Sequence, residues 1–140
     1  MEDTLPKHWL IKSEPFKYPW DQLVADGETV WDGVRNHRAA NNLKAMQVGD
    51  PLFFYHSNEG LEIVGIARVS ETGLIDPTDP EGKWPTVKVQ PVEKLASPVT
   101  LKAIKANPEL EGIELVRLGR LSVAEITPAE WQLILKMAEG

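Results

Sequence analysis

The sequence predicts an α+β fold, a small mixed or antiparallel β barrel of about five or six strands with α-helices on its flanks. Short apolar strand patterns follow one another as a meander, and about two or three helical stretches interrupt them. Gly65 lies inside one strand pattern, where a glycine is typical of a bulge that lets a sheet curl. Strands and helices do not alternate regularly and no glycine-rich phosphate loop is present, so a Rossmann-type sheet is not expected.

The length of 140 residues suits one domain, which we expect to span residues 1–140 and to bury a core without disulfides. Cysteine is absent, which excludes a disulfide framework, a thiolate zinc site and a cysteine nucleophile. No apolar run is long enough for a secretory signal or a membrane span. We therefore expect a cytoplasmic monomer without a membrane partner.

The net charge of -6 argues against nonspecific binding to nucleic acid, which depends on the neutralisation of many phosphates. Between Gly33 and Gly49, however, the sequence has Arg35, Arg38 and Lys44 and no acidic residue. This basic segment predicts either a selective contact with an anion or a solvated helix face that happens to be basic.

The first strand is predicted at residues 8–13, and a short helix is predicted at residues 21–25, ended by Gly27. The strand ends in Lys12, Ser13 and then Glu14, at a position where a sheet or barrel presents functional side chains. A salt-bridged strand terminus is the alternative interpretation of these residues.

The segment from Trp31 to Arg38 reads Trp-Asp-Gly-Val-Arg-Asn-His-Arg and holds the chemical groups of a recognition site. An indole offers a stacking face, and an amide can pair with the edge of a planar ligand. A guanidinium can bind a phosphate through two parallel hydrogen bonds. The alternative is that Trp31 fills the core and the charged groups are solvated. Asn36 is predicted to cap the helix that follows, because an amphipathic pattern begins at Ala39.

Two strands joined by a hairpin turn are predicted at residues 52–57 and 61–69, and Pro51 can only open the first of them. Alternate residues of the first strand face opposite sides, and we expect one of these sides to pack into the core. Residues 71–85 are rich in proline, glycine and acids, which predicts a loop in which Trp84 covers the barrel.

The last part of the chain begins with a half-buried strand at residues 86–92. A two-turn helix capped by Thr100 follows, and residues 115–123 are predicted to bend into a final strand. Residues 127–130, Thr-Pro-Ala-Glu, form a capping box that opens a closing helix, in which Trp131 is predicted to lie in the core.

Six ordered segments together resemble the EVE domain family, which includes bacterial single-domain proteins related to thymocyte nuclear protein. The segments are Trp9-Leu-Ile-Lys-Ser-Glu-Pro15, Trp31-Asp-Gly-Val-Arg-Asn36, Ala40-Asn-Asn-Leu-Lys-Ala-Met46, Gly49-Asp50, Phe54-Tyr-His-Ser57 and Arg120-Leu-Ser-Val123. The resemblance covers nearly the whole chain, and Pro51 is a small departure from it.

The resemblance implies a PUA-like pseudobarrel, akin to the YTH and ASCH domains, with a pocket for a modified base of DNA or RNA. For the family, reading of 5-methylcytosine or 5-hydroxymethylcytosine in DNA has been proposed, and no cofactor is implied. Carried over to this chain, the base-binding residues are Lys12, Ser13, Glu14, Trp31, Val34, Arg35, Asn36, Tyr55, His56, Ser57, Arg120, Leu121 and Ser122. Arg35, Arg38 and Lys44 would contact the flanking phosphates.

Such a pocket has to offset the few kcal/mol needed to take a base out of a duplex. Stacking on an aromatic ring returns about 1–3 kcal/mol, and Trp31 is the ring predicted to provide it. A buried methyl group adds only about 0.8 kcal/mol. Larger discrimination therefore requires polar contacts with the edge of the base, for which Ser13, Glu14 and Asn36 are the candidates.

Two other interpretations stay open. Lys12 and Glu14, with Tyr55 and His56, could form a small hydrolase site for a nucleoside or an amide if burial lowers the pKa of the lysine. A protein-interaction module is the other alternative. The three histidines lie in separate segments without the spacing of metal ligands, so no metal site is predicted.

Overall fold

The computed structural model describes residues 7–139, which fold into one mixed six-stranded sheet with flanking helices. The strands are β1 (His8–Ser13), β2 (Thr29–Val30), β3 (Pro51–His56), β4 (Glu62–Ile75), β5 (Pro85–Thr100) and β6 (Val123–Ile126). The helices are α1 (Trp20–Asp26), α2 (His37–Ala45), α3 (Leu101–Ala106), the 3-10 turn η1 (Pro108–Leu110), α4 (Glu114–Arg117) and α5 (Pro128–Ala138).

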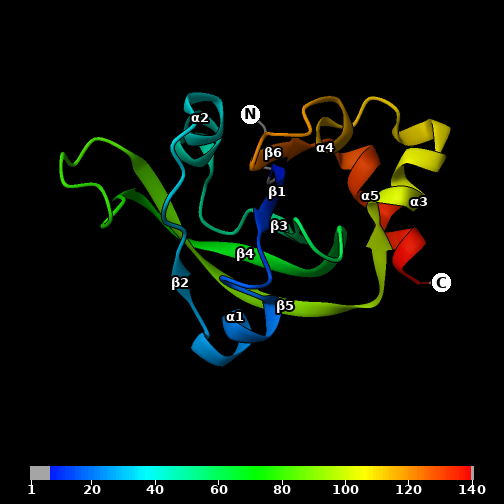
Figure 1. Cartoon of the computed structure of the whole chain (residues 1–140), viewed down its shortest axis with the longest axis horizontal. Helices are drawn as coiled ribbons and strands as arrows, with labels where there is room; N and C mark the ends of the chain where they lie inside the picture. Colours follow the sequence, from blue (N-terminus) through cyan, green and yellow to red (C-terminus); the bar gives the residue numbers. More distant parts are fainter. Residues whose placement is uncertain (1–6, 140) are drawn as a thin grey trace, which may run out of the picture.

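The strand order is β2-β5-β4-β3-β1-β6, in which only β1 and β3 are parallel neighbours (Figure 1). The predicted α+β class and the mixed sheet are confirmed. Within residues 7–139 the outer strands β2 and β6 do not pair with each other, so the sheet is strongly curved but not closed. No helix in this part of the chain has both the length and the hydropathy that a bilayer crossing requires.

Strand β1 lies between β3 and β6, and this position fixes the place of the residues that follow it. Trp9 is in register with Leu52 of β3 on one side and with Glu125 of β6 on the other. At the end of the strand, the Lys12 amide donates to the Ser122 carbonyl at 3.0 Å. The ends of β1 and β3 and the start of β6 therefore meet at one edge of the sheet.

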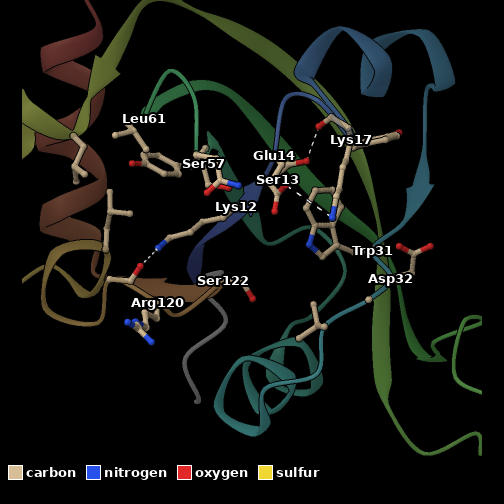
Figure 2. Close-up of a pocket in the computed structure, with 18 of the residues that line it drawn as sticks. Lys12, Ser13, Glu14, Lys17, Trp31, Asp32, Ser57, Leu61, Arg120 and Ser122 are labelled. Carbon is tan, nitrogen blue, oxygen red and sulfur yellow. Dashed lines mark hydrogen bonds and ion pairs between the residues drawn. The ribbon is translucent and has the colours of Figure 1, made fainter.

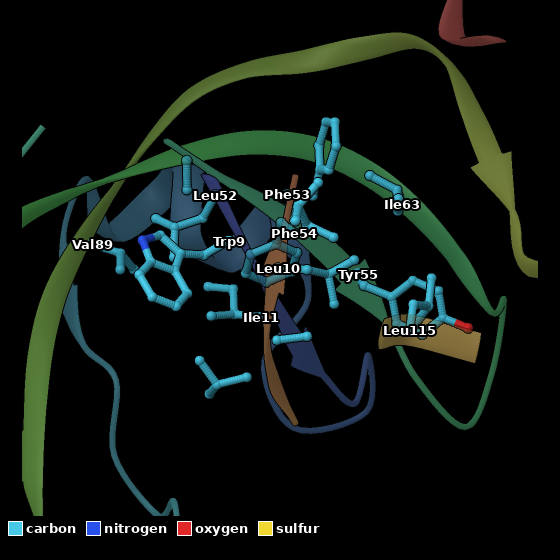
Figure 3. Packing of buried hydrophobic residues seen from close by; sticks show 14 of the residues in the cluster. Trp9, Leu10, Ile11, Leu52, Phe53, Phe54, Tyr55, Ile63, Val89 and Leu115 are labelled. Carbon is cyan, nitrogen blue, oxygen red and sulfur yellow. The ribbon is translucent and has the colours of Figure 1, made fainter. Parts of the chain in front are cut away.

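The core covers both faces of β3 (Figure 3). We expected only one side of this strand to be buried, and that expectation was wrong, because Phe53 and Phe54 are both fully buried. Trp131 of α5 stacks on Phe53 with ring centroids 3.8 Å apart, while Trp20 and Trp31 pack edgewise against Phe54. A helix covers one face and the curved N-terminal part of the chain covers the other, so no side of β3 is left to solvent.

The predicted irregularity at Gly65 is confirmed. The pairing of β4 with β5 shifts register between Ile63 and Gly65, which marks a β-bulge. A Cβ atom at Gly65 would lie 2.7 Å from the ring of Trp20, closer than any side-chain carbon tolerates. The glycine therefore lets α1 lie directly on the bulged strand.

The predicted helix starts are confirmed by their caps. The Ala39 amide donates to the Asn36 side chain at 2.9 Å, and the Ala103 amide donates to Thr100 at 3.0 Å. Thr127 and Glu130 exchange both hydrogen bonds of a capping box. Trp131 is buried in the core as predicted.

The hairpin of β4 and β5 is longer than predicted and forms a twisted ribbon across the molecule (Figure 1). Residues 71–75 pair with the start of β5, so the predicted loop shrinks to residues 76–84. Trp84 does not cover a barrel but stacks on His37 at 4.9 Å. The prediction of a loop failed because this part of the ribbon extends beyond the core, where polar residues and glycine are tolerated.

Candidate functional site

A cavity of about 1030 Å³ opens where the ends of β1 and β3 meet the segment after β2 (Figure 2). The turn after β1 and residues 29–35 form one side, and α3, α4 and the turn before β6 form the other. Among its lining residues are Lys12, Ser13, Glu14, Lys17, Tyr18, Trp31, Asp32, Val34, Arg35, Tyr55, Ser57, Asn58, Leu61, Lys105, Arg120 and Ser122.

Lys12 extends from the end of β1 across the middle of the cavity (Figure 2). Its ammonium donates to the Gly119 carbonyl at 2.8 Å and lies 5.9 Å from the ring centre of Tyr55, the residue beside it on β3. Burial lowers the pKa of Lys12. An ammonium has three donors, and the described residues accept from only one of them, so Lys12 can donate to a ligand.

The turn after β1 is held by its own hydrogen bonds. The Ser13 hydroxyl donates to the Tyr18 carbonyl at 2.5 Å, and the amides of Lys17 and Tyr18 donate to the Glu14 carbonyl. The Tyr18 hydroxyl donates to Asp26 at 2.7 Å, and its pKa is raised to about 12, mainly by burial. Among residues 7–139, the Glu14 carboxylate has one ion pair, with Lys17 at 3.9 Å, and accepts no side-chain hydrogen bond, so it keeps its capacity to accept from a ligand.

Trp31 forms part of the cavity wall, but its ring is not the open stacking face that the sequence led us to expect. The residue is only 8% exposed, and the rings of Tyr18 and Phe54 pack nearly perpendicular to it, at 83° and 81°. Its indole N–H has no acceptor among residues 7–139 and is not among the fully buried unpaired atoms. Trp31 therefore offers the cavity an edge with one free donor, because most of the ring serves the core.

Arg35 lines the cavity but is already paired. Its guanidinium lies 2.9 Å from the Asp76 carboxylate, which also accepts from the Gly33 and Thr78 amides, each at 2.7 Å. Burial raises the pKa of Asp76, but hydrogen bonds from Thr78, Arg35 and Gly33 outweigh burial and hold this pKa at about 2. The pair ties the segment after β2 to the loop between β4 and β5.

The structure brings most of the predicted base-binding residues to this one cavity: Lys12, Ser13, Glu14, Trp31, Val34, Arg35, Tyr55, Ser57, Arg120 and Ser122. Asn36, His56 and Leu121 do not line it. The Asn36 side chain caps α2, Leu121 is buried in the core, and the His56 ring nitrogen Nε2 accepts from the Trp20 amide at 3.1 Å. Burial lowers the pKa of His56, which favours the neutral ring that this bond requires.

The basic residues predicted to contact phosphate lie elsewhere or are occupied. Arg38 is outside the cavity and pairs with Glu114 at 3.3 Å. Lys44 lines a separate hollow of about 570 Å³ beside Trp84. Arg38 and Lys44 are close to the Trp31 segment in sequence, but they do not line its cavity, because α2 leads away from the cavity.

Sequence reasoning missed several lining residues. Tyr18 and Asp32 adjoin predicted site residues and could have been found by extending those segments. Lys105 of α3 and Asn58 of the hairpin turn carry no local signal, because only the tertiary fold brings them to the cavity. Residues 7–139 contain no group of three or more histidine, aspartate and glutamate side chains that could hold a metal ion.

Comparison with known proteins relates the chain to one family. A family model described as the EVE domain matches residues 7–137. Human thymocyte nuclear protein 1 is 31% identical over a region that covers 97% of this chain and 76% of that protein. A solved structure of a protein from Agrobacterium tumefaciens is 46% identical, with a TM-score of 0.92, over 94% of this chain and 92% of that one.

Two similar structures contain nucleic acid. Human thymocyte nuclear protein 1 was solved in complex with DNA containing 5-methylcytosine; it is 30% identical to this chain, with a TM-score of 0.89, over 96% of this chain and 98% of that one. A YTH domain from Zygosaccharomyces rouxii, solved with N6-methyladenosine RNA, has a TM-score of 0.60 at 17% identity over 97% of this chain and 88% of that one. The YTH domain shares the fold alone.

Proposed function

Because the chain belongs to the EVE domain family, we propose that its cavity binds a single modified base of a nucleic acid. The observation that carries the proposal is the human relative, which has the same fold over nearly its whole chain and was solved with DNA containing 5-methylcytosine. The lining of the cavity suits such a ligand, since aromatic edges, a carboxylate and an indole N–H without an acceptor among residues 7–139 converge there.

Size and polarity support a planar base as the ligand. Pockets for drug-sized molecules measure about 300–1,000 Å³, so a cavity of about 1030 Å³ has room for one base and part of its backbone. The Glu14 carboxylate can accept from the exocyclic amino group of cytosine or adenine, and the Trp31 indole can donate to a ring acceptor. The apolar side chain of Val34 can contact a methyl group of the base.

Glu14 is the residue that we assign to the edge of the base. Of the three polar candidates, Asn36 lies outside the cavity and the Ser13 hydroxyl already donates to Tyr18. A hydrogen bond to a charged group contributes about 1.5–3 kcal/mol, which corresponds to a discrimination of roughly 10-fold to 100-fold against a base without an exocyclic amino group. A buried methyl group alone would give only about 4-fold.

Binding of labelled oligonucleotides tests the proposal. Single-stranded and duplex 12-mers with one central 5-methylcytosine, N6-methyladenine or unmodified base are titrated by fluorescence anisotropy, and product formation is followed by mass spectrometry. We expect at least one modified oligonucleotide to bind about 4-fold tighter than its unmodified form, because the methyl group is the difference between the two. Equal affinity for every form would contradict the proposal, and turnover would favour the hydrolase alternative.

The role of Glu14 is tested in the same assay. Glu14→Gln keeps the size of the side chain but removes its charge and turns one acceptor into a donor. We expect this variant to bind 12-mers with a central cytosine or adenine, modified or not, roughly 10-fold or more weakly, because it loses the acceptor for the exocyclic amino group. Glu59→Gln is the matched control, because Glu59 is exposed in the hairpin turn and does not line the cavity. Equal losses in the two variants would remove Glu14 from the site.

A further inference from the structure

The charged side chains are unevenly distributed between the two ends of the cavity. Its acidic lining residues, Glu14 and Asp32, lie at the end near Trp31 (Figure 2). The cations Lys17 and Arg35 belong to the same side and are paired with carboxylates, so this end carries both signs of charge. At the other end, formed by α3, α4 and the turn before β6, the charged lining residues are Lys105 and Arg120, and Lys12 reaches towards this end to contact Gly119. This end is called the α3 end below.

We propose that the α3 end holds the phosphates that flank the bound base, with Lys105 and Arg120 as their main contacts and Lys12 between phosphate and base. The inference rests on the proposed function and deepens it, because it assigns a path to the nucleic-acid backbone across the site. The base enters towards Trp31 and Glu14, and the backbone passes over α3 and the turn before β6.

Pairing distinguishes these cations from the other cations that line the cavity. Within residues 7–139, Lys12, Lys105 and Arg120 form no salt bridge. Arg35 and Lys17, the other cations that line the cavity, are paired with Asp76 and Glu14. A paired cation has to break its ion pair before it can bind a phosphate, which reduces the net free energy of the phosphate contact. An unpaired cation has no such loss.

Lys12 connects the two ends. It is half-buried, and the one hydrogen bond of its ammonium in the described structure goes to the Gly119 carbonyl, next to Arg120 in the chain. A phosphate oxygen or a base carbonyl can take up its remaining donors, which compensates the cost of holding an ammonium in a partly desolvated site. This proposal therefore assigns the phosphate contacts to the α3 end and not to Arg35, Arg38 and Lys44, where the sequence predicted them.

The test compares salt dependence among charge-removing variants. Lys105→Gln and Arg120→Gln are titrated with a single-stranded 12-mer that contains one 5-methylcytosine, between 50 and 200 mM salt, and with the free nucleoside 5-methylcytidine. Each lost phosphate contact should reduce the slope of log K against log salt by about 0.7. We expect both variants to bind the 12-mer about 3-fold to 10-fold more weakly and to bind the nucleoside as the parent chain does.

Matched controls separate this effect from a general change in charge. Lys102→Gln removes the same charge from an exposed position of α3 that does not line the cavity, and Arg38→Gln removes an arginine outside it. Both should leave the slope unchanged. A slope reduced as much in these variants, or an equal loss for the nucleoside and the 12-mer, would overturn the assignment of the α3 end.

The result also distinguishes this inference from the proposed function. If the parent chain prefers the modified 12-mer but Lys105→Gln and Arg120→Gln keep its slope, the phosphate path is wrong and the base site stands. If the parent chain shows no preference for a modified base, the proposed function fails and the phosphate path fails with it.

Discussion

Trp31 serves the core and the cavity wall at the same time. An aromatic ring contributes its full stacking free energy, about 1–3 kcal/mol, only when a face is open to the base. With 8% of the residue exposed and two aromatic rings against it, Trp31 is left with its N–H and an edge as means of recognition. Removal of the whole ring would leave a large cavity, so a smaller change is the informative one.

Trp31→Phe removes the indole N–H and keeps an aromatic ring in the core. We expect affinity for the modified oligonucleotide to fall about 2-fold to 10-fold, since one neutral hydrogen bond contributes about 0.5–1.5 kcal/mol. Anisotropy titration measures the change, and Trp84→Phe is the control because Trp84 does not line this cavity. Unchanged affinity in Trp31→Phe would show that the indole does not donate to the ligand.

The ionisation of Asp76 makes the free energy of unfolding depend on pH in the acidic range. Its pKa is lowered from 3.8 to about 2 in the folded chain, so the carboxylate stabilises the fold above pH 3.8 and this contribution disappears as the pH falls towards 2. The shift corresponds to about 2 kcal/mol. Asp76→Asn should lower the free energy of unfolding by about this amount at pH 7 and by progressively less down to pH 2.

Urea unfolding at several pH values measures the contribution of Asp76. The control is Asp32→Asn, because Asp32 is exposed and accepts no side-chain hydrogen bond within residues 7–139. A difference between the parent chain and Asp76→Asn that stays constant from pH 7 to pH 2 would contradict the lowered pKa.

At the scale of elements, local chemistry could be predicted and mutual placement could not. The caps at Asn36, Thr100 and Thr127 were predictable because each involves residues within one turn. The burial of both faces of β3 was not, because it depends on Trp131 and Trp20 from distant parts of the chain. At the α3 end, Arg120 and Ser122 were predicted from the family resemblance, but Lys105 escaped prediction for the same reason as β3. The end of β1 was found because a strand terminus is visible in sequence.

The contact between α1 and the bulge in β4 is tested by Gly65→Ala. The added methyl would lie 2.7 Å from the Trp20 ring and would force the helix or the strand to move. Overpacking of this kind costs about 1–3 kcal/mol, which urea unfolding would report as a lower midpoint. Gly112→Ala is the matched control, since a methyl there meets no atom within 4 Å and should leave stability nearly unchanged. Equal midpoints for the two variants would mean that Trp20 yields without cost.

At the scale of the whole molecule, charge sets how the protein meets nucleic acid. A net charge of -6 opposes general attraction to phosphates, so affinity has to come from the cavity. With two or three phosphate contacts, the slope of log K against log salt for a single strand should be about -1.5 to -2. Anisotropy titrations at several salt concentrations measure this slope, and a value steeper than about -4 would show that many more phosphates are contacted.

The pairing of β1 with both β3 and β6 means that the two ends of the chain build the cavity together. Lys12 stands at the beginning of the sequence, yet its amide and its ammonium bind the carbonyls of Ser122 and Gly119, more than 100 positions later. Contacts of such long range slow folding, because closing a long loop costs conformational entropy before the contact is made. During synthesis, a chain that ends before Gly119 lacks β6, one of the two strands that pair with β1, and also lacks Gly119, Arg120 and Ser122 of the cavity lining.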